Sequence, residues 1–193
     1  VQNNEWRFEQ AETDFQALVA DAEARRAPPA EMGEALLNLA LNVSNNGRFA
    51  EADRLFRDAD AQVAAANDPL LAAQARTYRA LHLRNAGRFA EAVEAGQAAL
   101  RASQQARTAS GIGAAGPVAV VAACGDVAIG PELSQALNRR PAGRDVMGGS
   151  RVSLADRLTV QDAQALEVVG SSLAAQGDVA GAREALGRAS RLL

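Results

Sequence analysis

The stretch GRFAEADRLFRDA at residues 47–59 returns 40 residues later as GRFAEAVEAGQAA at residues 87–99, and the first six letters are identical. A third version of the same frame, GDVAGAREALGRA, occupies residues 177–189. Similarity at a fixed step is typical of proteins built by stacking one structural unit several times. This repeated frame indicates the fold class.

Each frame carries apolar or small residues at steps of three, four and three, which is the spacing of one face of an α-helix. The chain contains 46 alanines, and aromatic residues make up only 4% of it. Small side chains allow helices to approach closely, so the frame alanines are predicted core positions. The four instances are Phe8-Ala11-Phe15-Leu18, Phe49-Ala52-Phe56-Ala59, Phe89-Ala92-Gly96-Ala99 and Val179-Ala182-Leu186-Ala189.

A further helical stretch precedes Gly47, Gly87 and Gly177, each of which lies where that helix must end. Glycine is favoured there because it adopts positive φ at little cost. Asp68-Pro69 predicts a helix start, since aspartate caps a helix and proline fits its first position. Two other segments, Ser153–Asp156 and Thr159–Asp162, have the spacing of a capping box. The predicted unit is therefore a helix, a glycine turn and a second helix.

In these residues the chain resembles the tetratricopeptide repeat (TPR) family. The resemblance implies an all-α fold, a superhelical array of antiparallel helix pairs. Its usual unit has 34 residues, so a step of 40 implies longer helices. The matching residues are Ala40, Gly47, Phe49, Ala52, Phe56 and Ala59, then Ala80, Gly87, Phe89, Ala92 and Ala99, then Gly170, Gly177, Val179, Ala182, Leu186 and Ala189.

We expect one array over residues 1–193. Arg76 and Arg79 depart from the family pattern, which places apolar side chains there. Residues 118–123, VAVVAA, could alternatively form a short strand, but a lone strand between helices has nothing to pair with. The expected parts are a half-repeat helix at 5–27, repeat 1 at 30–66, repeat 2 at 68–106, a degenerate repeat at 111–140, an insert loop at 141–157 and a last repeat at 158–193.

Composition and residue counts exclude several classes of site. A net charge of -3 offers no basic field for nucleic acid. A single cysteine, Cys124, and a single histidine, His82, exclude an internal disulfide and any metal motif that needs two histidines or several cysteines. The longest uncharged run, residues 108–125, is too weakly apolar for a membrane span. We therefore predict no cofactor and no membrane span, and a lone cysteine fits either the cytoplasm or the periplasm.

Two patterns resemble chemical motifs but lack the required context. Residues 111–116 spell G-x-G-x-x-G, yet a polar helical segment precedes them instead of a strand, so a linker is the better interpretation. Cys124 and His82 could be a nucleophile and a base, but they lie on different predicted helices without an orienting group. Cys124 also lies in an apolar run, where thiols are usually inert. We predict that the chain is not an enzyme.

A polar row on the first helices is the best candidate for a binding site. Amide side chains both donate and accept hydrogen bonds, so they suit an extended peptide backbone. The TPR resemblance implies that first helices line a concave groove. The alternative is an ordinary exposed polar face. The candidate peptide-binding residues are Asn38, Asn42 and Asn45 in repeat 1, and Tyr78, His82 and Asn85 at the same places in repeat 2.

These features support two hypotheses of function. The first is a non-catalytic scaffold that binds a protein or peptide partner on its concave face. The second rests on overall resemblance to the N-terminal arrays of bacterial CHAT-domain proteins, and makes the chain a regulatory segment of a larger CHAT-type peptidase. The N-terminal half-repeat lacks a partner helix, so we expect that an adjoining part of the array, another chain, or self-association covers it.

Overall fold

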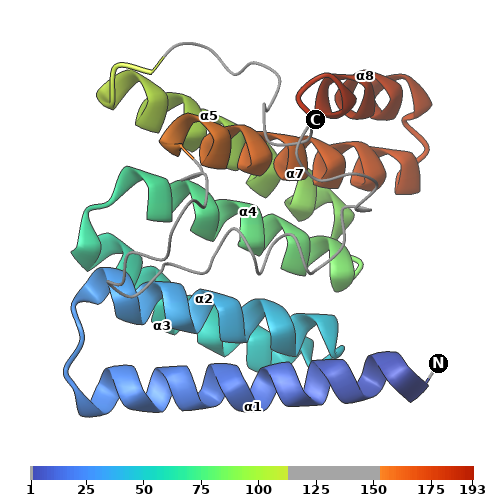
Figure 1. Ribbon diagram of the computed structural model, residues 1–193. Coiled ribbons are helices and arrows are strands. Elements are labelled where there is room, and N and C mark those ends of the chain that lie inside the picture. Colours follow the sequence, from blue (N-terminus) through green and yellow to red (C-terminus); the bar gives the residue numbers. More distant parts are fainter. Residues whose placement is uncertain (1, 113–152) are drawn as a thin grey trace.

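The computed structural model describes residues 2–112 and 153–193, with side chains from residue 11 onward, and every regular element in them is a helix (Figure 1). The all-α fold class is therefore confirmed for this part of the chain. The helices are α1 (Gln2–Ala24), α2 (Pro29–Asn45), α3 (Phe49–Ala66), α4 (Pro69–Asn85), α5 (Phe89–Ala109), α7 (Leu154–Ala175) and α8 (Val179–Ser190).

The helices pack in consecutive pairs, α2 with α3, α4 with α5, and α7 with α8. Successive pairs also touch, because α4 packs against α2 and α3, and α7 packs against α4 and α5. Helix α1 lies against α2 at one end of the molecule, and α8 lies at the other (Figure 1). The last pair thus stacks directly on the α4–α5 pair.

The three turn glycines close their helices as predicted. Gly47, Gly87 and Gly177 have φ of 78°, 74° and 86°, where a side chain would cause strain. In each turn the residue after the glycine donates its N–H to a carbonyl five residues earlier, as Arg48 does to Val43 at 3.2 Å. The glycine itself donates to a carbonyl three residues earlier. This Schellman pattern satisfies carbonyls that the helix end leaves free.

One of the two predicted capping boxes is real and the other is wrong. Ser153 Oγ accepts the backbone N–H of Asp156, whose carboxylate accepts the N–H of Ser153, so α7 begins at Leu154. Thr159 and Asp162 lie within α7 and are buried. The spacing alone could not distinguish the two, because capping requires non-helical backbone before the first turn. Asp68 caps α4 as predicted, accepting the N–H of Leu70 at 2.9 Å.

The frame alanines occupy the core. All six predicted alanines in α3, α5 and α8 are buried, and Ala52 and Ala92 are 0% exposed. Phe56 is also 0% exposed and belongs to the same apolar cluster as Leu37 and Val43 of α2. Small residues at these places let the helices of a pair approach closely. The buried frame alanines are Ala52, Ala59, Ala92, Ala99, Ala182 and Ala189.

Helix α1 uses only one of its two apolar sides. Phe15 and Val19 pack against the cluster that α2 contributes to, and Ala22 is 1% exposed. Leu18, at the frame position of Ala59, is 53% exposed. That position faces the first helix of its own pair, and within the described residues no helix precedes α1. Helix α1 therefore packs against α2 through one side, while Leu18 on its other apolar side is exposed.

Gly96 occupies the place that Phe56 holds in the first frame, and α7 approaches α5 closely there. A Cβ atom on Gly96 would lie 2.6 Å from Cγ2 of Val169 and 3.3 Å from the carbonyl oxygen of Ala165. This contact joins two helices that are separated by more than 40 residues of sequence. Residues 113–140 of the predicted degenerate repeat, which include VAVVAA and Cys124, lie outside the described residues, and so do residues 141–152 of the predicted insert loop.

We predict that leucine at either central alanine position destabilises the protein. Ala52→Leu and Ala92→Leu should each lower the free energy of unfolding by about 1–3 kcal/mol, because a fully buried site has no room for three more carbons. Chemical denaturation would measure the loss. Ala65→Leu, on an exposed position of α3, is the matched control and should change stability little. Equal effects at Ala52 and Ala65 would contradict the packing described above.

A second prediction concerns the approach of α5 to α7. Gly96→Ala should destabilise the protein despite a gain of up to about 1 kcal/mol in helix propensity, because its methyl group meets Val169. The double variant Gly96→Ala/Val169→Ala should cost less than the two single variants added together, by about 1 kcal/mol or more. Additive costs in a denaturation series would show that the two helices do not touch there.

Candidate functional site

The six residues predicted to bind a peptide do not form one exposed row. His82 is 0% exposed, Tyr78 is 2% exposed and Asn42 is 6% exposed. This part of the prediction is wrong, because these three side chains are buried within the fold instead of facing a groove. Asn45 is exposed, and Asn38 and Asn85 are half-buried.

The exposed end of the predicted row does connect two helix pairs. Nδ2 of Asn85 donates to Oδ1 of Asn45 at 2.9 Å, joining the C-terminal ends of α4 and α2. The two asparagines hold equivalent places before Gly47 and Gly87. The two places are therefore neighbours in space, and their amides bind one another.

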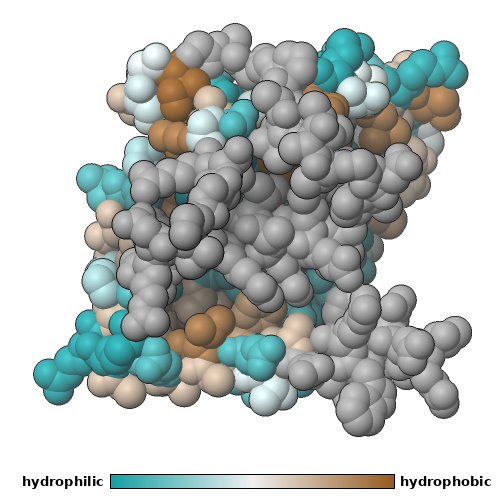
Figure 2. All heavy atoms as spheres, viewed as in Figure 1, coloured by the Kyte–Doolittle hydropathy of each residue, from teal (hydrophilic) through white to brown (hydrophobic). Residues whose placement is uncertain are grey.

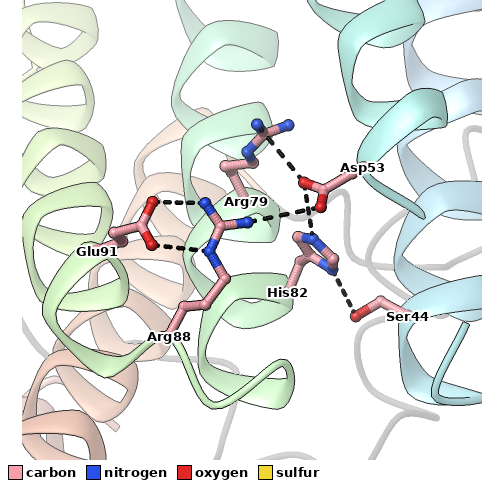
Figure 3. Close-up of polar contacts among 6 residues, drawn as sticks. All are labelled: Ser44, Asp53, Arg79, His82, Arg88 and Glu91. Atoms are coloured by element: carbon pink, nitrogen blue, oxygen red, sulfur yellow. Dashed lines mark hydrogen bonds and ion pairs between the residues drawn. The ribbon is translucent and has the colours of Figure 1, made fainter. Parts of the chain in front are cut away.

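His82 instead organises a buried polar contact between the first two helix pairs (Figure 3). Its Nδ1 lies 2.9 Å from Oγ of Ser44 on α2, and its Nε2 lies 3.2 Å from Oδ1 of Asp53 on α3. Its ring also packs on Phe56, with 5.1 Å between ring centroids. Burial lowers the pKa of His82, although the hydrogen bond to Asp53 opposes this shift. The ring is therefore neutral at pH 7.

Ser44, His82 and Asp53 have the residue types and hydrogen-bond order of a nucleophilic triad. The exposure of the hydroxyl distinguishes this cluster from a catalytic triad. Ser44 is 1% exposed and His82 is 0% exposed, so no substrate carbonyl can reach the hydroxyl in this arrangement. A triad also needs donors placed around the developing oxyanion, and a hydroxyl buried in this way cannot present a substrate to such donors. The cluster is suited to holding α4 against α2 and α3.

Charged groups continue this cluster to the surface. Oδ2 of Asp53 lies 3.5 Å from Nη1 of Arg88, and its Oδ1 lies 3.9 Å from Nη2 of Arg79 (Figure 3). Arg88 also binds Glu91 through two hydrogen bonds, one of them 2.8 Å long. The guanidinium of Arg79 lies over the Phe56 ring, 5.6 Å from its centroid. This explains why arginine is tolerated at position 79, where an apolar residue was expected.

The pair Asp53–Arg88 has an equivalent one helix pair earlier. Glu12 directly follows Ala11, as Asp53 follows Ala52, and it accepts hydrogen bonds from Arg48 and from Asn46. Arg48 and Arg88 both directly follow the turn glycine. In both cases a carboxylate on the second helix of one pair binds the arginine that follows the turn glycine of the next pair. These residues were not identified as a site from the sequence, although the shared G-R dipeptide was a signal for it.

The third boundary uses a different contact. Val93 follows Ala92, and Asp178 follows Gly177, so the carboxylate and the arginine of the ion pair are both missing from these places. Instead Arg107 on α5, which is 1% exposed, donates to Thr159 at 2.9 Å and to Asp162 at 3.1 Å on α7. Burial raises the pKa of Asp162, while the charge of Arg107 and its hydrogen bond to the carboxylate oppose this rise. No sequence pattern predicted this contact.

An open groove of about 490 Å³ lies between the C-terminal half of α3 and the N-terminal half of α4. Val63, Ala72 and Ala75 contribute apolar walls, and Asp60 and Arg76 contribute opposite charges. Among the described residues, no three acidic, histidine or cysteine side chains are placed to hold a metal ion. None of the described helices is both long and apolar enough to span a bilayer.

Comparison of the chain with models of known families, with curated proteins and with solved structures finds no match. The TPR resemblance therefore depends on the repeated frame of the sequence.

We predict that acid destabilises the protein through His82. Because its folded-state pKa lies below the ordinary 6.5, the unfolded chain takes up this proton first as pH falls. Stability should therefore decrease below about pH 6.5, by at most about 1.4 kcal/mol per pH unit. Asp53, Arg79 and Arg88 are the charged groups that face the ring, and only Asp53 favours its protonation.

Denaturation curves between about pH 7.5 and pH 5.5 would measure this dependence. His82→Asn is the matched variant, since asparagine occupies the same place in the preceding pair, at Asn42. Its stability should fall less steeply over this range. Because the chain has one histidine, equal slopes for the two proteins would refute the assignment.

Proposed function

We propose that the chain is a non-catalytic scaffold that binds a partner protein or peptide on the concave face of a TPR-like array. The main support is the equivalence of the helix pairs. Frame alanines are buried in α3, α5 and α8 alike, and the turns after α2, α4 and α7 share one geometry. Stacking such pairs extends a continuous surface of first helices, which is the surface that repeat arrays use for binding.

The arrangement of the first helices supports this face. Helix α4 packs against both α2 and α7, so the first helices adjoin one another in one layer. Asn45 and Asn85 lie near the ends of α2 and α4 and can exchange their mutual hydrogen bond for bonds to a peptide backbone. This exchange would leave no amide unsatisfied, which keeps its cost low.

A peptide-array screen with the purified chain, followed by binding titrations, tests the proposal. Asn45→Ala/Asn85→Ala should weaken binding of the selected peptides by about tenfold or more. Gln97→Ala/Gln104→Ala removes two exposed amides from α5, a second helix, and should leave binding unchanged. If no peptide is selected, or if both double variants bind equally well, the concave-face assignment is wrong.

A further inference from the structure

The groove between α3 and α4 changes in character along its length. The turn at residues 67–69 lines one end of it, and the apolar side chains of Val63 and Ala72 line the part next to this turn. Asp60 and Arg76 lie farther out, one on each helix and equally far along the chain from the middle of the turn. Helices rise about 1.5 Å per residue, so these two charges lie about 12 Å from the turn. The groove thus has an apolar inner part and a charged outer part.

Asp60 and Arg76 line the same groove but do not bind each other. Asp60 forms no hydrogen bond or ion pair with any residue that the structure describes. Arg76 donates to the backbone carbonyl of Ala72 on its own helix, at 3.2 Å, and pairs with no described carboxylate. Burial raises the pKa of Asp60, although the charges of Arg79 and Arg76 oppose this rise. The outer part of the groove therefore holds an anion and a cation that each lack a close partner of opposite charge.

Arg79, the last residue that lines this outer part, has a further donor without an acceptor. Its Nη2 lies 3.9 Å from Oδ1 of Asp53, and its guanidinium lies over the ring of Phe56. Its Nη1 has no hydrogen-bond acceptor in the described part of the chain, although water does not reach this atom. Buried donors of this kind are rare in folded proteins. A carboxylate held by Arg76 would bring an acceptor to the same end of the groove.

The geometry points to this groove as a binding site for a free α-amino acid with an aliphatic side chain, such as leucine. Its carboxylate binds the guanidinium of Arg76, and its ammonium group binds the carboxylate of Asp60. Its side chain extends toward the turn, between Val63 and Ala72. An α-amino acid carries both charges on one carbon atom, next to its apolar part, and this is the order of groups along the groove. Either terminus of a peptide carries only one of the two charges and leaves the other residue of the groove without a partner.

L-Leucine is the first probe, and three analogues each remove one of its contacts. Isocaproate lacks the ammonium group, isoamylamine lacks the carboxylate, and glycine lacks the side chain. Titrations of the isotope-labelled full chain, followed by the NMR signals of the backbone amides of residues 60–76, measure the dissociation constants. The groove is open to solvent, so we expect a dissociation constant of about 1 mM for leucine. Each analogue should bind about tenfold or more weakly than leucine.

Two charge variants test which residue binds which group of the ligand. Asp60→Asn and Arg76→Ala should each weaken leucine binding about tenfold or more. Asp60→Asn should bind isocaproate at least as well as the unchanged protein does, because this ligand has no ammonium group. That selectivity would not follow from damage to the fold. Asp58→Asn and Arg57→Ala are the matched controls, since both residues are exposed on α3 outside the groove, and they should leave leucine binding unchanged.

Three results would overturn the proposal. The first is the absence of saturable shifts with leucine. The second is equal leucine binding by Asp60→Asn and Asp58→Asn, and the third is binding of isocaproate by the unchanged protein as tightly as leucine. None of these results bears on peptide binding at Asn45 and Asn85, because Asn85 lies at the other end of α4 from the groove. The two proposals therefore fail independently.

Discussion

The close approach of each second helix to its own first helix is the contact on which the other features depend. It requires small side chains where the two helices meet, and the buried alanines Ala52, Ala92 and Ala182 supply them. Once this side is used, the remaining apolar side of the second helix must be covered by the next pair. Phe56 and Gly96 are covered in this way. The pairing of helices and the stacking of pairs therefore use two sides of the same second helix.

The polar residues near the boundaries have a structural explanation. Packing α4 onto α3 buries the ring of His82, and a buried ring needs partners for both nitrogens. Ser44 and Asp53 provide them. Arg88 then shares the Asp53 carboxylate at the surface. A group that looks like a catalytic triad in composition is thus a hydrogen-bonded joint between helix pairs.

The polar contacts between neighbouring helix pairs differ along the molecule. The first two use a carboxylate with the arginine after a turn glycine, near the surface and open to solvent, where such pairs contribute little to stability. The boundary between α5 and α7 buries Arg107 with Asp162. A buried charge left without its partner is costly, so this contact selects one alignment of α7 on α5. Local chemistry thus differs while the backbone arrangement stays similar.

The sequence by itself determined the all-α class, the glycine turns and the alanine core, because these depend on local backbone preference and on periodicity along one helix. It also indicated the caps at Asp68 and Ser153. Only the tertiary structure decided whether a polar position on a first helix faces solvent or the neighbouring pair. Asn45 and His82 belong to the same predicted row, yet Asn45 is exposed and His82 is buried. Their exposure depends on which helix packs beside them. Helical periodicity shows which residues share a face, but it does not show which helix covers that face.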